Sequence, residues 1–266
     1  MRPGASSPRA KIPDMIEQFL SEALPAVLDY RLALAALAAM ASALIRGYAG
    51  FGVAMMMVPS LSMLYGPIEA IAITIMVGFV GQSQLLPPAL GKAHWPELGP
   101  LLIAVILSAP LGTMILFAVD PQIVRRVIGI LVLGASITLA TGWSYKGPRG
   151  TLQGVITGLL CGSITGATGL GAPIAAVYFL ASSHAVAVQR ANIIITMCTL
   201  IMVMLIPFAW SGNIDQLSIA RSIGLFPIAI FGTWLGNRLF RITGDGHYKH
   251  YAIGLLILTG FATVIF

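Results

Sequence analysis

Two glycine clusters with the same spacing lie inside long apolar stretches of the chain. Their members are Gly47, Gly50 and Gly52 in the first cluster and Gly166, Gly169 and Gly171 in the second. An opened backbone has no water to bond inside lipid, so such breaks survive only where protein or a wet cavity surrounds them. A helix that restarts after each cluster would point free N–H groups and its positive dipole end into the protein, where anions bind.

The two clusters therefore predict an electropositive cage of backbone N–H groups for a small tetrahedral or pyramidal oxyanion. Broken helices at matching places in two halves of a chain are also typical of a transporter's binding site. The alternative is that the glycines only allow helices to pack closely, as small residues do at membrane interfaces. Phe51 lies between Gly50 and Gly52 and is included in the predicted substrate site.

Arg46 immediately precedes the first cluster, and Thr165 holds the corresponding position before the second. An arginine at membrane depth is energetically costly, which makes it a functional candidate by default. We predict that Arg46 pairs with the bound anion and that Arg46→Ala abolishes transport. The alternative is an arginine that snorkels to the interface or bonds the carbonyls exposed at the helix break. Because Thr165 is neutral, the two halves would contribute unequally to one shared site.

Several other polar side chains lie within or next to apolar segments and are candidates for orienting the anion. They are Gln82, Ser83, Thr168, Arg190 and Asn192. Gln82 and Ser83 lie well inside their segment and are stronger candidates than Arg190, which could be a plain interfacial charge. Thr168 could donate its hydroxyl to the anion or bond back to its own helix.

The sequence offers no constellation for catalysis or metal binding. Cys161 and Cys198 lie in apolar segments with no second Cys or His at metal-ligand spacing, and the four histidines fall in or near loops. We expect no catalytic residue, no metal site, no cofactor and no enzymatic activity. No carboxylate lies at mid-membrane, so coupling to protons or Na⁺ is not expected. An exported anion gains about 2.3 kcal/mol per charge per 100 mV of membrane potential, which suffices for export.

The composition predicts the setting of these residues. The chain of 266 residues is 58% hydrophobic and 9% charged, with a mean hydropathy of +0.92, whereas soluble domains are about 25% charged. We predict an integral, multi-pass membrane protein. The net charge of +6 suits anionic lipid headgroups better than nucleic acid. The expected partners are the lipid bilayer and a small anion, and a homo-oligomer is compatible with the sequence.

The apolar segments predict an all-α fold of two homologous four-segment repeats. They lie at about 31–65, 67–90, 97–118, 123–143, 151–182, 185–210, 216–240 and 248–266. When the glycine clusters are aligned, Gly112-Thr113 meets Gly232-Thr233 with a small shift. We divide the chain into a tail at 1–30 with an interfacial amphipathic helix, a first repeat at 31–146 and a second repeat at 147–266.

The first segment of each repeat is too long for one upright span, since roughly 20 residues cross the hydrocarbon core. Such a segment either crosses steeply tilted, which gives parallel repeats, or turns at its glycines and leaves on the side it entered. The second arrangement, a re-entrant hairpin, leaves three spans in each repeat and makes the repeats inverted, as in many secondary transporters. The hairpin is the favoured interpretation.

With these clusters, the duplicated halves and its length, the chain resembles the TauE/SafE family, also called the sulfite exporter or toluene-sulfonate uptake permease family, over about 32–266. The resemblance implies a transporter of the bacterial inner membrane, and an exporter of sulfite or organosulfonates is favoured. It places the six cluster glycines near the transport path. Transport of a small carboxylate and a non-catalytic role in a membrane assembly are the alternatives.

Overall fold

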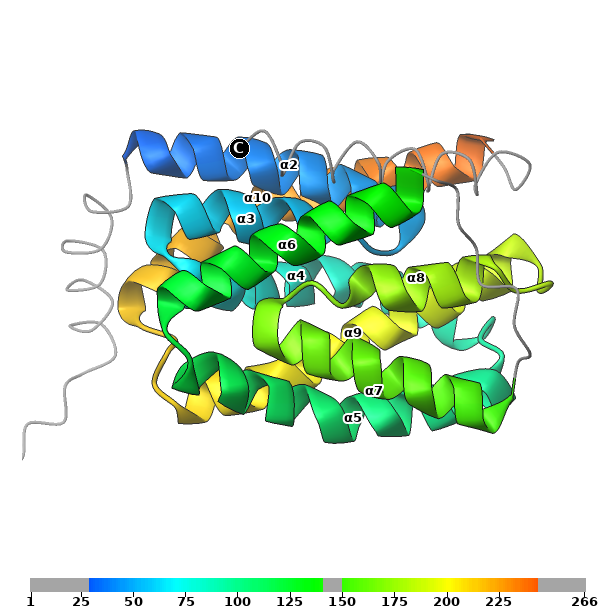
Figure 1. Cartoon of the computed structure of the whole chain (residues 1–266). Helices are drawn as coiled ribbons and strands as arrows, with labels where there is room; N and C mark the ends of the chain where they lie inside the picture. Colours follow the sequence, from blue (N-terminus) through cyan, green and yellow to red (C-terminus); the bar gives the residue numbers. More distant parts are fainter. Residues whose placement is uncertain (1–28, 141–149, 244–266) are drawn as a thin grey trace, which may run out of the picture.

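The computed structural model describes residues 29–140 and 150–243, and within these ranges every regular element is a helix (Figure 1). The helices are α2 (Tyr30–Ala49), α3 (Val53–Tyr65), α4 (Pro67–Leu90), α5 (Trp95–Ala118), α6 (Pro121–Ala140), α7 (Thr151–Thr168), α8 (Ala172–Leu180), α9 (Val186–Trp210) and α10 (Gln216–Thr243). Five of them are long and apolar enough to cross a membrane. The prediction of an all-α polytopic membrane protein is confirmed. The predicted interfacial helix and the last predicted span lie outside the described residues.

Helix boundaries coincide with the residues that the sequence marks as breakers. Asp29 caps α2 by accepting a hydrogen bond from the Tyr30 backbone N–H at 2.6 Å. Gly66 separates α3 from α4 with a φ of 92°, a conformation that glycine adopts without steric cost. Pro67 follows at the first position of α4, where its missing N–H would have no intrahelical partner.

The bundle has two ends that can be defined by side-chain contacts. At the first, here named the Glu69 end, Glu69 of α4 forms an ion pair with Arg221 of α10. At the second, named the His94 end, His94 before α5 lies against His184 before α9, with ring centroids 4.4 Å apart. The helices run between these two ends, as Figure 1 shows.

Each glycine-broken segment folds back as a helical hairpin. In the first, α2 and α3 run antiparallel, and Arg31 at the start of α2 donates to the Leu64 carbonyl at the end of α3. This hairpin opens at the Glu69 end, whereas the hairpin of α7 and α8 opens at the His94 end (Figure 1). The segment at 31–65 thus begins and ends at the same end of the bundle. A re-entrant hairpin has this arrangement, whereas a single tilted helix does not.

The closest helix contacts join one helix from each predicted repeat. Helix α10 packs along α2, α5 packs along α7, and α4 packs against α9. At two of these contacts the backbones touch, because a Cβ at Gly47 would collide with Gly236, and one at Gly112 would collide with Gly166.

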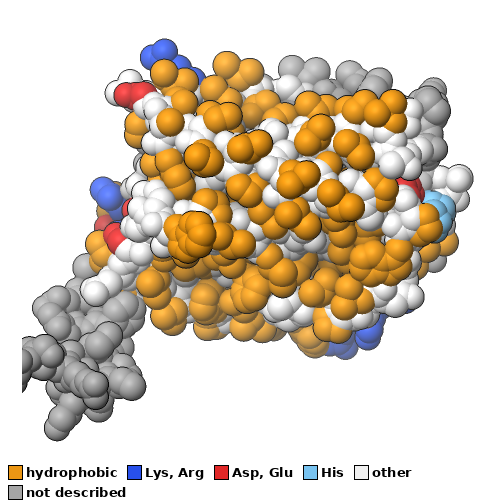
Figure 2. All heavy atoms as spheres, turned by 90° about the horizontal axis from the view of Figure 1, so that it is seen from below, with side chains coloured by type: hydrophobic (Ala, Val, Ile, Leu, Met, Phe, Trp, Pro, Cys, Tyr) orange, Lys and Arg blue, Asp and Glu red, His pale blue; other side chains and the backbone are white. Residues whose placement is uncertain are grey.

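The outer surface of the bundle is apolar. Figure 2 shows hydrophobic side chains across the face it views, with charged side chains at the margins. On α5 a row of large side chains is exposed: Ile103, Leu107, Leu111 and Met114. Monomeric soluble proteins rarely expose an apolar surface of this extent. Such a surface is suited to contact with lipid.

Candidate functional site

The three glycines of each cluster have different structural roles. Gly50 ends α2 with a φ of 88° and donates its N–H to the Arg46 carbonyl at 2.7 Å. Gly169 ends α7 with a φ of 78° and donates to the Thr165 carbonyl at 2.6 Å. Both are left-handed helix caps, a conformation that other L-residues rarely adopt. Gly52 precedes α3 with a φ of 105°. The helix breaks are therefore produced by Gly50 and Gly52 in the first cluster and by Gly169 in the second.

The first glycine of each cluster is a packing residue. Gly47 touches the backbone of α10, and Gly166 touches the backbone of α5. Gly171 has an ordinary helical φ of −75°, but a Cβ there would collide with Thr165 and with the Cys161 carbonyl. The packing alternative therefore accounts for Gly47, Gly166 and Gly171, whereas it does not account for the left-handed positions.

A cavity of about 60 Å³ lies between the two breaks, and we name it the central cavity. One water molecule needs roughly 10–15 Å³ of such space, so the cavity has room for a few waters or a small anion. Gly52 and the first residues of α3 line it from one hairpin, and Gly169 and the first residue of α8 line it from the other. No side chain of the described residues forms a capping hydrogen bond at the N-terminus of either half-helix. Both breaks and the first residues of both half-helices therefore lie at the cavity wall.

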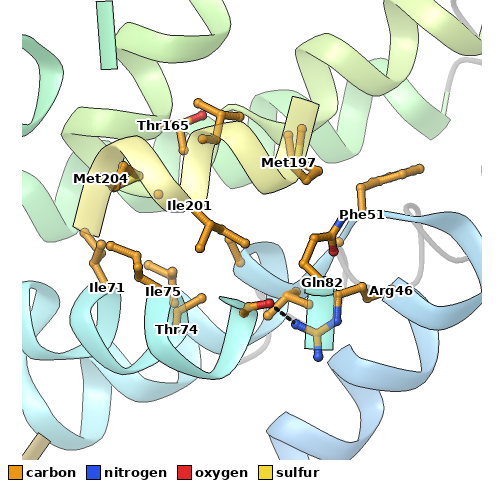
Figure 3. A pocket seen from close by; sticks show the side chains of 18 residues that line it. Arg46, Phe51, Ile71, Thr74, Ile75, Gln82, Thr165, Met197, Ile201 and Met204 are labelled. Carbon is orange, nitrogen blue, oxygen red and sulfur yellow. Dashed lines mark hydrogen bonds between the residues drawn. The ribbon is translucent and has the colours of Figure 1, made fainter. Parts of the chain in front are cut away.

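The polar side chains of the central cavity gather from both hairpins and from α4. They are Arg46, Thr74, Gln82 and Thr165. Arg46 and Gln82 lie side by side at one end, while Ile71, Ile75 and Met204 form an apolar opposite end (Figure 3). Thr74 lies beside Ile75 (Figure 3), so the part of the lining away from Arg46 is mainly apolar and also contains a hydroxyl.

Arg46 is 1% exposed, and no carboxylate pairs with it in the part of the chain that the structure describes. Its guanidinium donates to Thr233 Oγ1 at 2.9 and 3.3 Å and to the carbonyls of Gly78 and Val77 at 3.3 and 3.5 Å. A side chain at Gly81 would collide with the guanidinium, so this glycine makes room for it. Neutral acceptors solvate the charge without cancelling it, and the cavity therefore carries a net positive charge.

Gln82 bridges the first glycine break to α9. Its side-chain N–H group donates to the Gly50 carbonyl at 3.3 Å and to the Ile194 carbonyl at 2.9 Å. A second cavity of about 50 Å³, named the outer cavity, lies toward the His94 end and is lined by Lys92, Arg190 and Ile194 among others. The Gln82 bridge therefore stands between two cavities that each contain a basic side chain.

Thr74 is a cavity residue that the sequence reasoning missed. Its hydroxyl is buried, lines the central cavity, and has no hydrogen-bond partner among the described residues. A buried hydroxyl without a partner is unfavourable by about 1–3 kcal/mol unless a ligand or water satisfies it. A signal was present, because Thr74, Gly78 and Gln82 follow one another at four-residue spacing and so share one helix face.

Three of the predicted polar residues lie away from the central cavity. Arg190 donates to the Tyr48 and Gly47 carbonyls at 3.0 and 2.6 Å, and so neutralises the negative C-terminal end of α2. Asn192 is fully buried and accepts the His94 backbone N–H at 3.0 Å. Ser83 is exposed and bonds the Val80 carbonyl.

Thr168 uses its hydroxyl locally. It donates to the Ile164 carbonyl at 2.7 Å and accepts the Leu170 N–H at 3.3 Å, which closes the turn at the second break. This is the back-bonding alternative that the sequence left open. Phe51 lines the central cavity next to Gly52.

Apolar spans, two broken helices and, between them, a buried cation that pairs with no described carboxylate define a multi-pass membrane transport protein. The sequence profile described as Sulfite exporter TauE/SafE matches residues 34–263. The chain belongs to this family, which is a family of transporters. No curated protein and no solved structure matches the chain.

Proposed function

We propose that the chain carries a small sulfur-containing oxyanion, sulfite or a short organosulfonate, through the central cavity, and that it acts as an exporter in a bacterial inner membrane. The observation that carries the proposal is the buried guanidinium of Arg46, which lines the cavity and has only neutral partners among the described residues. A charge buried without a counter-ion is energetically unfavourable, so a bound anion would offset the desolvation cost of the Arg46 charge. Membership of the sulfite exporter family supports sulfur as the central atom.

The half-helix N-termini add a second attraction for the anion. Val53 and Ala54 of α3 and Ala172 of α8 line the cavity at the positive ends of their helices. Backbone N–H groups at such ends bind tetrahedral and pyramidal oxyanions well. The apolar end near Ile71 and Met204 would hold the hydrocarbon part of an organosulfonate. Passage toward the His94 end would then require the Gln82 bridge to open.

The proposal is tested by anion flux into and out of proteoliposomes under an imposed potassium–valinomycin potential. The anions are sulfite, a taurine-like sulfonate, sulfate and acetate. The variant is Arg46→Met, since Met has a comparable length and replacing a buried charge by an apolar side chain is often neutral or stabilising. Arg238→Met, at an exposed arginine of α10 over the Trp234 ring, is the matched control.

We expect potential-driven flux of sulfite or the sulfonate in the wild type and in Arg238→Met, and a loss of at least about 100-fold in Arg46→Met, since hydrogen bonds to a charged group contribute about 1.5–3 kcal/mol each. Unchanged flux in a folded Arg46→Met protein would remove Arg46 from the mechanism. Flux of acetate without flux of any sulfur anion would replace the proposed substrate by a carboxylate. No flux of any anion would favour the assembly role.

A further inference from the structure

Three side chains that can bind a metal meet at the His94 end, outside the central cavity. His94 is the residue before α5, Glu97 lies in the first turn of α5, and His184 lies in the loop between α8 and α9. One donor atom from each of them lies within 4.8 Å of the other two. His184 is far from the other two in sequence, which is why cysteine and histidine spacing predicts no metal site here.

The distances are close to those of a transition-metal site. The Glu97 carboxylate oxygen Oε2 lies 3.1 Å from His184 Nε2 and 3.8 Å from His94 Nδ1. Around a tetrahedral Zn²⁺ with bonds of about 2.0–2.2 Å, neighbouring donor atoms are about 3.3–3.5 Å apart. Small rotations of the two imidazoles, whose side chains are 42% and 33% exposed, would bring all three donors to that spacing.

The surroundings favour a ligand role over a simple ion pair. His94 Nδ1 is buried and has no hydrogen-bond partner among the described residues, because 3.8 Å is too long for one. The Glu97 side chain is only 9% exposed. The buried Asn192 side chain fixes the position of His94 by accepting its backbone N–H.

We propose that His94, Glu97 and His184 bind a divalent transition metal of the Zn²⁺ type, with a water molecule as the fourth ligand. Two imidazoles and one carboxylate are an established donor set for Zn²⁺, and three protein ligands leave one position open. The ligands come from the predicted first and second repeats, so the metal would join the α8–α9 loop to the start of α5. This proposal concerns metal binding and stands independently of the transported anion.

The test is Zn²⁺ titration by calorimetry of the full chain, purified in detergent with a tag that contains no histidine run. Absorption of bound Co²⁺ in the visible range serves as a second readout, since it reports coordination geometry. The variants are His184→Ala and His184→Cys, because a thiolate can replace an imidazole as a zinc ligand whereas a methyl group cannot. Asp120→Asn, which removes a carboxylate that caps α6 instead, is the control.

We expect one Zn²⁺ per chain in the wild type, in Asp120→Asn and in His184→Cys, with Co²⁺ bands that change when Cys replaces His. His184→Ala should bind more than about 100-fold more weakly, since loss of outer-shell partners alone weakens metal binding roughly 10–100-fold. Equal Zn²⁺ affinity in a folded His184→Ala protein would overturn the proposal. So would the absence of Zn²⁺ binding by the folded wild type.

Discussion

Thr74 provides the most selective test at the scale of one residue, because its hydroxyl lines the central cavity and has no hydrogen-bond partner within 29–140 and 150–243. Val has nearly the same shape and lacks only the hydroxyl. In Thr74→Val we expect an apparent KM for the transported anion about 10-fold higher, which corresponds to one hydrogen bond of about 1.4 kcal/mol to a charged group. The melting temperature should stay equal or rise, since a buried unsatisfied group is removed.

Thr196→Val is the matched control for this prediction. Thr196 is also buried, but its hydroxyl donates to the Asn192 carbonyl at 2.8 Å and does not line the central cavity. The control should therefore leave KM unchanged and lower the melting temperature slightly. If Thr74→Val transports with an unchanged KM, the hydroxyl does not contact the anion, and the site is smaller than proposed.

At the residue scale, sequence reasoning found the charge but not all of its surroundings. Arg46 could be predicted because an arginine inside an apolar segment is costly wherever it points. Its neutral acceptor Thr233 could not be predicted, since it lies on a helix that is distant in sequence. Ser83 and Gln82 are adjacent, yet only Gln82 lines the cavity, because neighbouring residues point to different faces of a helix.

At the scale of the helices, the glycine contacts predict a clear difference between two Gly→Ala substitutions. A Cβ at Gly112 of α5 would collide with the backbone of α7, whereas a Cβ at Gly134 of α6 would meet no atom of the described residues within 4 Å. We expect Gly112→Ala to destabilise the protein by about 1–3 kcal/mol through overpacking. Gly134→Ala should stabilise it by about 0.5–1 kcal/mol, since alanine loses less backbone freedom on folding.

The readout for both substitutions is thermal unfolding of the detergent-solubilised protein, followed by size-exclusion chromatography after heating. A decrease in midpoint temperature for Gly112→Ala, with an equal or higher value for Gly134→Ala, is the expected order. The reverse order would mean that α5 and α7 are not in backbone contact in the membrane protein.

Helix existence and approximate bounds were accessible to sequence reasoning, whereas helix pairing was not. Hydrophobic length and the glycine clusters around Gly50 and Gly169 predicted the described helices to within a few residues. The sequence could not show that α5 packs on α7 and α10 on α2. Small residues allow helices to approach closely but do not determine which helix is the partner. For the same reason it could not predict the meeting of His94 with His184.

At the scale of the whole molecule, the two hairpins open at opposite ends of the bundle, and this predicts an inverted orientation of the repeats. Tyr30 and Tyr65 bound the first hairpin, and Thr151 and Ser183 bound the second. In single-cysteine variants at these positions, we expect a membrane-impermeant maleimide to label 30 and 65 from one side of the membrane. It should label 151 and 183 from the other side.

The alternative topology gives a different result in the same experiment. If the segment at 31–65 crossed the membrane as one tilted helix, positions 30 and 65 would be labelled from opposite sides, and the repeats would be parallel. The native Cys161 and Cys198 are buried, so the unsubstituted protein is the background control. Inverted repeats place their two helix breaks on opposite sides of the central cavity, so that rocking one repeat against the other would expose the anion to each side in turn. Labelling of both ends of each hairpin from the same side would therefore support inverted repeats, which this alternating-access mechanism requires.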